Sequence, residues 1–93
     1  MSGIDTTRLP ARLDQLLLAV DQFIHIFAEG PTVEELAGEV CSPWSTVHAD
    51  LTALVDAGLI RRELHQERSI TITAAGRARI GELAADLDRK ADE

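Results

Sequence analysis

The segment of residues 32–76 constrains the fold most strongly, because helix start and stop signals follow one another there at short intervals. Thr32, with Glu35 three positions later, forms a capping box that opens a short helix to about residue 40. Ser42-Pro43 restarts a helix, with the serine as its cap and the proline at its first position. Gly58 supplies the left-handed residue that ends this second helix. The segment therefore predicts two helices joined by a tight turn.

The sequence on either side of this helix pair predicts a first helix, two strands and a last helix. Residues 10–29 form a first helix, which Gly30-Pro31 stops. Beyond the helix pair, alternating apolar and polar residues predict two strands, 60–64 and 69–73, joined by a short polar tip. Thr73 is then positioned to cap a last helix. These elements are arranged as three helices, two strands and one helix.

The predicted fold class is mainly α with a small β-hairpin (α+β), and the 93 residues allow a single domain, 1–93. Within it we expect a flexible tail at 1–8, a first helix at 10–29, a helix pair at 32–58, a hairpin at 59–73 and a C-terminal helix at 74–90.

Composition argues against several classes of function. The single Cys41 cannot form a disulfide within the chain, and His25, His48 and His65 are too scattered to complete a zinc site with it. Cys41 is expected to be a small, half-buried residue in the turn. No catalytic triad or phosphate-binding glycine loop is present in the sequence, so we expect no enzyme activity and no cofactor. The longest apolar run, 16–20, is too short to span a membrane, and the expected location is the cytoplasm.

The first helix carries more apolar surface than one core can cover. One stripe recurs at three- and four-residue spacing, at Leu13, Leu16, Leu17, Val20, Ile24 and Phe27. Three further apolar residues fall outside it, and together with two on the last helix they predict a homodimer interface: Leu18, Phe23, Ile26, Leu83 and Leu87. In the alternative, the last helix of the same chain covers this second face.

The run from Ser45 to Arg62 contains a helix with the pattern Leu-x-x-Leu-x-x-x-Gly-Leu-Ile followed by two arginines, and residues 67–76 read ERSITITAAG. This arrangement resembles the winged helix-turn-helix regulators, especially MarR-type regulators and the N-terminal domains of LexA-type repressors. The resemblance implies a DNA-binding transcriptional regulator, nucleoid-associated in the cell, whose second helix of the pair enters the groove of double-stranded DNA. The residues that it assigns to DNA on this helix and its turn are Ser42, Trp44, Ser45, Thr46, His48 and Thr52.

The charge distribution departs from that family in one place. Residues 29–58 contain six acidic and no basic residues, so the helix that would enter the groove has no Lys or Arg. The positive charge gathers in the hairpin and just after it. We therefore predict that Arg61 and Arg62 contact phosphate and that Arg68, at the hairpin tip, enters the minor groove. In the alternative, the arginines of this region, which also include Arg77 and Arg79, pair with Glu63, Glu67 or Glu82 of the same chain.

Asp50 and Trp44, on the helix that would enter the groove, complicate the assignment of this helix to DNA binding. Asp50 is expected near phosphate, where its charge would oppose binding. Trp44 is expected to pack onto the first helix as a core anchor; if exposed, it would contact a thymine methyl group or a protein partner. The acidic helices consequently keep a second function open, that of a winged-helix module which binds a basic or DNA-binding protein.

Overall fold

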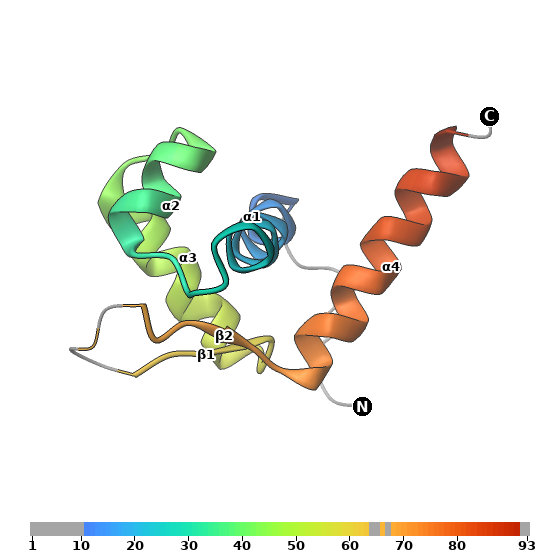
Figure 1. Cartoon of the computed structure of the whole chain (residues 1–93). Helices are drawn as coiled ribbons and strands as arrows, with labels where there is room; N and C mark the ends of the chain where they lie inside the picture. Colours follow the sequence, from blue (N-terminus) through green and yellow to red (C-terminus); the bar gives the residue numbers. More distant parts are fainter. Residues whose placement is uncertain (1–10, 64–65, 67, 92–93) are drawn as a thin grey trace, which may run out of the picture.

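The computed structural model describes residues 11–63, 66 and 68–91, and the side chains up to residue 86. Figure 1 shows the order of the elements, which is the order predicted from the sequence. The helices are α1 (Ala11–Phe27), α2 (Val33–Val40), α3 (Trp44–Asp56) and α4 (Ala74–Ala91), and the strands are β1 (Ile60–Arg61) and β2 (Thr71–Ile72). The mainly α class with one antiparallel hairpin is thus confirmed, and the layout matches that of a winged helix-turn-helix. The predicted tail at 1–8 lies outside the described residues.

The core lies between the first three helices and the base of the hairpin. Its buried apolar side chains come from all of these elements: Leu13, Leu16, Leu17, Val20, Leu36, Val47, Leu51, Leu54, Leu59, Ile60 and Ile70. Burial of a Leu or Ile side chain contributes about 1.5–3 kcal/mol each, so this cluster is what fixes α2 and α3 against α1. The stripe predicted for α1 is confirmed through Val20, but Phe27 is mostly exposed.

The ends of α2 combine one confirmed prediction with two corrections. Thr32 accepts a hydrogen bond from the Glu35 N–H at 3.1 Å, and Glu35 accepts from the Thr32 N–H at 2.9 Å, which completes the capping box. Cys41 ends the helix in a left-handed conformation and is exposed rather than half-buried. The N–H of Ser42 donates to the Ala37 carbonyl oxygen, so Ser42 closes the end of α2. The prediction that Ser42 caps α3 is therefore wrong. Helix α3 begins after Pro43 with no side-chain cap.

The end of α3 has the geometry predicted for it. Gly58 is left-handed (φ 76°), its N–H donates to Val55, and the N–H of Leu59 reaches back to Leu54 at 3.0 Å. These two bonds form a Schellman motif, and the buried Leu59 supplies the hydrophobic contact that accompanies it. The motif turns the chain directly into β1, which positions the hairpin beside α3.

The hairpin is shorter in strand content than predicted. Among the described residues, the paired positions are Ile60 with Ile72 and Arg61 with Thr71, where strands of five residues each were expected. Beyond these pairs, Ser69 replaces the ladder, because its hydroxyl accepts from the Glu63 N–H at 2.9 Å. The hydroxyl also lies within hydrogen-bonding distance of the Glu63 and Gln66 carbonyl oxygens. A side chain thus closes the upper hairpin where backbone pairing stops. Leu64, His65 and Glu67 are outside the described residues.

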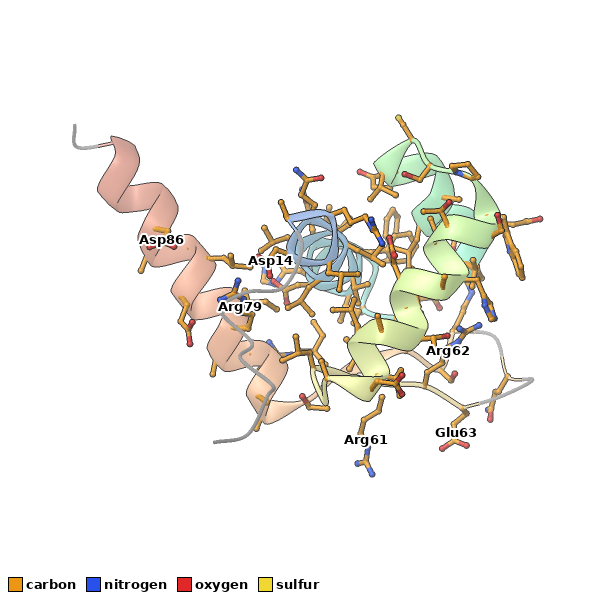
Figure 2. All side chains as sticks on the ribbon, turned by 180° about the vertical axis from the view of Figure 1, so that it is seen from behind. Asp14, Arg61, Arg62, Glu63, Arg79 and Asp86 are labelled. Carbon is orange, nitrogen blue, oxygen red and sulfur yellow. The ribbon has the colours of Figure 1, made fainter. Side chains whose placement is uncertain are left out.

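Helix α4 packs on α1 through ion pairs near its start. Thr73 caps α4 as predicted, accepting from the Gly76 N–H at 3.0 Å. Figure 2 shows Arg79 directed at Asp14, with a guanidinium–carboxylate distance of 2.7 Å and both side chains largely buried. Arg77 lies 3.8 Å from Asp21, which also belongs to α1. Farther along, α4 extends away from the other helices (Figure 1).

Helix α1 ends two residues before the predicted boundary. Ala28 adopts a left-handed conformation (φ 59°) and donates its N–H to Ile24, which stops the helix ahead of Gly30. Among the described residues, no helix is long and apolar enough to cross a membrane.

Candidate nucleic-acid interface

The outward face of α3 is neutral along most of its length. Its buried side is formed by Val47, Asp50, Leu51 and Leu54. On the opposite side, Ser45, Ala49 and Thr52 are exposed at three- and four-residue spacing, so they form one stripe that ends at Asp56. His48 and Trp44 flank the stripe on one side and Thr46 flanks it on the other. The residues predicted for DNA contact on α3 are therefore all accessible to some degree, with His48 the least exposed of them.

Asp50 does not lie on that face. It is buried against α1, where both of its carboxylate oxygens accept from the Arg12 Nε at 3.2 Å. The expectation that Asp50 opposes a phosphate is therefore wrong, because its charge points into the protein and is paired there. Nothing in the sequence identified Arg12 as its partner, since 38 positions separate the two residues.

Trp44 is not the core anchor that was expected. Its side chain is 52% exposed at the first position of α3, and its ring stacks on His48 with centroids 5.0 Å apart. The physical reason is its phase on the helix, because the inward positions in the first two turns belong to Val47, Asp50 and Leu51. The indole thus stands at the edge of the outward face.

A groove of about 630 Å³ runs from Trp44 to the hairpin. One wall is the start of α2 with the residues just before it, and the other is the hairpin beyond β1. Its lining includes Pro31, Thr32, Val33, Glu34, Glu35, Arg62, Glu63, Gln66, Arg68, Ser69 and Ile70. The groove separates the stripe on α3 from the hairpin tip.

Arg68 is held by the protein itself. Its guanidinium lies 3.1 Å from Glu29 and 3.1 Å from Glu35, and it donates to the Gly30 carbonyl oxygen at 3.5 Å. The alternative of intramolecular pairing is therefore found for Arg68, but with different acids from those considered. It is found with an expected acid for Arg79, which lies 3.4 Å from Glu82. We call Glu29, Glu35 and Arg68 the wing clamp, because it ties the hairpin to the α1–α2 connection.

The same contacts affect the ionisation of Glu35. Its pKa lies below the ordinary value of 4.5, first because the Thr32 N–H donates to the carboxylate. Burial opposes this shift, while hydrogen bonds from Arg68 and the Thr32 side chain add to it. The carboxylate is thus kept ionised and committed to both the capping box and the wing clamp.

Arg61 and Arg62 differ from the other arginines. Arg12, Arg68, Arg77 and Arg79 each have an acidic partner. Within residues 11–63, 66 and 68–86, neither Arg61 nor Arg62 has an ion pair. Arg61 is exposed and points away from the body of the protein (Figure 2), whereas Arg62 is half-buried at the groove. Among the described side chains, the arginines without an acidic partner therefore lie at the exit of β1.

The predicted DNA-contact residues other than the exposed Arg61 lie in four different environments. Ser45, Thr46, His48 and Thr52 belong to the outward face of α3 or its flanks, and Trp44 with Arg62 lines the groove beside it. Ser42 is half-buried in the turn, where its hydroxyl donates to Val40 at 3.4 Å. Arg68 is engaged in the wing clamp. The sequence interpretation missed Ala49, although its helical spacing from Ser45 and Thr52 was a usable signal.

The predicted dimer residues are partly accessible. Ile26 is 62% exposed, and Phe23 is half-buried with its ring 4.5 Å from that of Phe27. Leu18 lines a smaller cavity beside Val40 of α2, and Leu83 is half-buried on α4. The side chain of Leu87 is outside the described part. Helix α4 of the same chain therefore leaves the end of α1 uncovered.

The comparisons with known proteins point to one kind of regulator. No protein-family model matches the chain. The chain is similar to the LexA repressor of Ligilactobacillus salivarius (strain UCC118), with 42% identity over 64 residues. The match covers 66% of this chain and 31% of that repressor, so the chain spans about a third of the length of the relative. Of the two regulator types that the sequence resembles, this similarity supports the LexA type; the MarR type stays a prediction.

Proposed function

We propose that the protein is a DNA-binding transcriptional regulator that acts as a small repressor. The observation that carries the proposal is the outward face of α3, an accessible helix face that presents neutral side chains as far as Asp56 and lies beside two arginines without acidic partners among the described residues. A helix of this size fits the major groove of B-form DNA. The similarity to a LexA repressor supports the same kind of function.

The roles of the two parts of this surface follow from their charges. Arg61 and Arg62 contact phosphate, which sets the position of the protein on the duplex but carries no sequence information. Ser45, His48 and Thr52 face the base edges, with Thr46 and Trp44 beside them and Ser42 next to the backbone. Arg68 reaches the minor groove only if duplex phosphates draw it from the wing clamp, so we rank it below Arg61 as a DNA contact.

The regulator is proposed to act as a homodimer. The support is the apolar surface that α4 leaves open at the end of α1, where Ile26 and Phe27 are both more than half exposed. Leu18, Phe23, Leu83 and Leu87 extend the proposed interface. A dimer also doubles the number of arginines that reach phosphate, which raises the affinity available to a subunit that presents Arg61 and Arg62 among its described side chains.

The test is a fluorescence-anisotropy titration of random-sequence duplex DNA at two salt concentrations. Arg61→Ala removes one phosphate contact from each subunit, so we expect weaker binding and a salt slope reduced by about 2 per dimer. Arg77→Ala is the matched control, because it removes the same side chain from α4, where Arg77 pairs with Asp21. Equal effects of the two substitutions on affinity and salt slope would contradict phosphate contact by the hairpin arginines. No duplex binding by the wild type at low salt would contradict the function itself.

A second function is supported by the exposure of Trp44. Its ring stands at the groove together with Glu34, Glu35 and Glu63, and aromatic residues at the edge of an acidic surface are common anchors for a basic protein partner. Trp44→Ala is expected to abolish binding of such a partner, and Trp44→Phe to retain part of it. If instead Trp44→Ala weakens only duplex binding, the interaction module is excluded.

A further inference from the structure

We propose that α3 recognises the C5-methyl groups of thymine, so that the preferred duplex carries methyl groups in the major groove opposite Ala49 and Thr52. The inference rests on the proposed function, since it names the class of duplex that the same helix face prefers. The source of selectivity is then contact between apolar groups and not a hydrogen-bond pattern.

The first step is what α3 lacks. Bidentate hydrogen bonds to guanine come from Arg or Lys, and those to adenine from Asn or Gln. None of these four residue types occurs anywhere from Trp44 to Asp56. Asp50, which has the acceptor groups for cytosine, is buried and paired with Arg12. The helix therefore has few means of reading a base by hydrogen bonds.

The second step is what the outward face offers instead. The hydroxyl of Thr52 donates to the His48 carbonyl oxygen at 3.1 Å, so it is turned back onto the preceding turn of the helix. The methyl group is then the part of this side chain that is free to contact a ligand. Ala49 is exposed one turn earlier and Val55 is partly exposed three positions later. Small apolar groups thus run along the helix next to the stacked pair of Trp44 and His48.

The third step concerns the occupant of this face. A protein partner would need large apolar anchors, whereas Ala49 and Thr52 together bury too little area to hold one. The thymine methyl group is small, apolar and displayed in the major groove, where Ala and Thr side chains contact it in protein–DNA complexes. Arg61 lies on the strand that follows α3 and Arg62 directly follows that strand, and both complement the phosphates that flank such a groove. The small size of the apolar groups on α3 and the positive charge of the two arginines therefore both favour a thymine-containing duplex over a protein partner.

The experiment compares duplexes that differ in one methyl group per pyrimidine. Anisotropy titrations at fixed salt use alternating dA–dT against alternating dA–dU, and alternating dG–dC against the same duplex with 5-methylcytosine. We expect binding to weaken about threefold to fivefold for each contacted methyl group that uracil lacks, and to strengthen by a similar factor with 5-methylcytosine. The second pair guards against differences in the stiffness of the dA–dU duplex.

Two matched variants assign the effect to a residue. Thr52→Ser removes the methyl and keeps the hydroxyl, so it should lower the ratio of dA–dT to dA–dU affinities by about threefold to fivefold, and the share that Ala49 contributes should remain. Thr71→Ser makes the same change at an exposed position of β2 that is not among the proposed DNA contacts, and it should leave the ratio as in the wild type. Circular dichroism establishes that both variants fold, and Ala49→Ser serves as the second probe of the stripe. Duplex binding with equal affinity for thymine and uracil would overturn the inference and leave the proposed function standing, whereas the absence of binding to every duplex would overturn both.

Discussion

At the scale of single residues, the pairing of Asp50 decides whether α3 repels DNA. Its carboxylate is 11% exposed and its partner Arg12 is 67% exposed, so the two members of the pair depend on each other unequally. Removal of the arginine leaves a buried charge without a partner, whereas removal of the carboxylate frees an arginine that water can solvate.

This asymmetry gives a prediction for stability and for DNA binding. Arg12→Ala should lower the free energy of unfolding by about 1–3 kcal/mol, and Asp50→Asn by less than about 1 kcal/mol, as measured by urea denaturation. Asp50→Asn should leave duplex affinity unchanged, because the residue faces α1. Asp56→Asn, which removes the exposed acid at the end of the stripe, should strengthen binding. Stronger binding by Asp50→Asn would mean that this carboxylate does approach phosphate.

Glu35 gives a prediction for the dependence of stability on pH. Its pKa is lowered in the folded protein, so its contribution is fully present above the ordinary value of 4.5 and is lost as pH falls through the lower folded value. Glu35→Gln keeps the capping geometry without the charge, so the variant should lose less stability than the wild type between about pH 5 and pH 3. Thermal unfolding across this range measures the difference, with Glu34→Gln as the control for loss of one acid from the same turn. Parallel curves for wild type and Glu35→Gln would contradict the assignment.

At the scale of elements, the wing clamp and Gly30 fix the hairpin against the α1–α2 connection. A Cβ atom at position 30 would lie 2.6 Å from the Ile70 carbonyl oxygen and 2.9 Å from that of Arg68. Both are backbone atoms, which cannot move aside as a flexible side chain does. Gly30 therefore permits a close approach of two chain segments, and Arg68 then pairs with the acids on either side of it.

Two glycine substitutions separate this close approach from ordinary helix propensity. Gly30→Ala should lower the free energy of unfolding by about 1–3 kcal/mol, because the added methyl group forces the hairpin or the connection to shift. Gly38→Ala should raise it by up to about 1 kcal/mol, since position 38 lies inside α2 with no atom within 4 Å of the added group. Denaturant midpoints measure both effects. A neutral Gly30→Ala would show that the hairpin is not held closely at this point.

At the scale of the whole molecule, binding to DNA depends on both the net charge and the oligomeric state. The chain carries a formal net charge of −7, so binding to duplex DNA depends on a local excess of positive charge and not on the overall field. A dimer in which Arg61 and Arg62 of both subunits contact phosphate should give a salt slope of only about 3–4.

The proposed interface predicts how a single substitution changes the oligomeric state. Ile26→Glu should convert a dimer into a monomer in light scattering, because it places a charge at the centre of the apolar surface. The control is His25→Glu, one position earlier and about 100° around the helix, which should remain dimeric. Monomeric wild-type protein at tens of micromolar would remove the dimer from the proposal.

Helix ends whose signals lie within a few neighbouring residues could be predicted from the sequence. The Thr32–Glu35 capping box, the left-handed Gly58 and the Thr73 cap each depend on residues within a few positions, and all three are confirmed. The failures at the C-terminal end of α1 and in the turn between α2 and α3 are also local. There Ala28 and Cys41 take left-handed conformations that other residue types usually supply.

Which charged side chains are available to a ligand depends on tertiary contacts between residues far apart in the sequence. Asp50 meets Arg12 across 38 positions and Arg68 meets Glu35 across 33, distances over which no pattern in the sequence indicates a partner. Packing of α3 on α1 turns Asp50 inward and Trp44 outward, since a rotation of the helix by one residue would exchange such positions. The element order follows from local chemistry, whereas the neutral face of α3 and the lack of an acidic partner for Arg61 and Arg62 among the described residues follow from long-range packing.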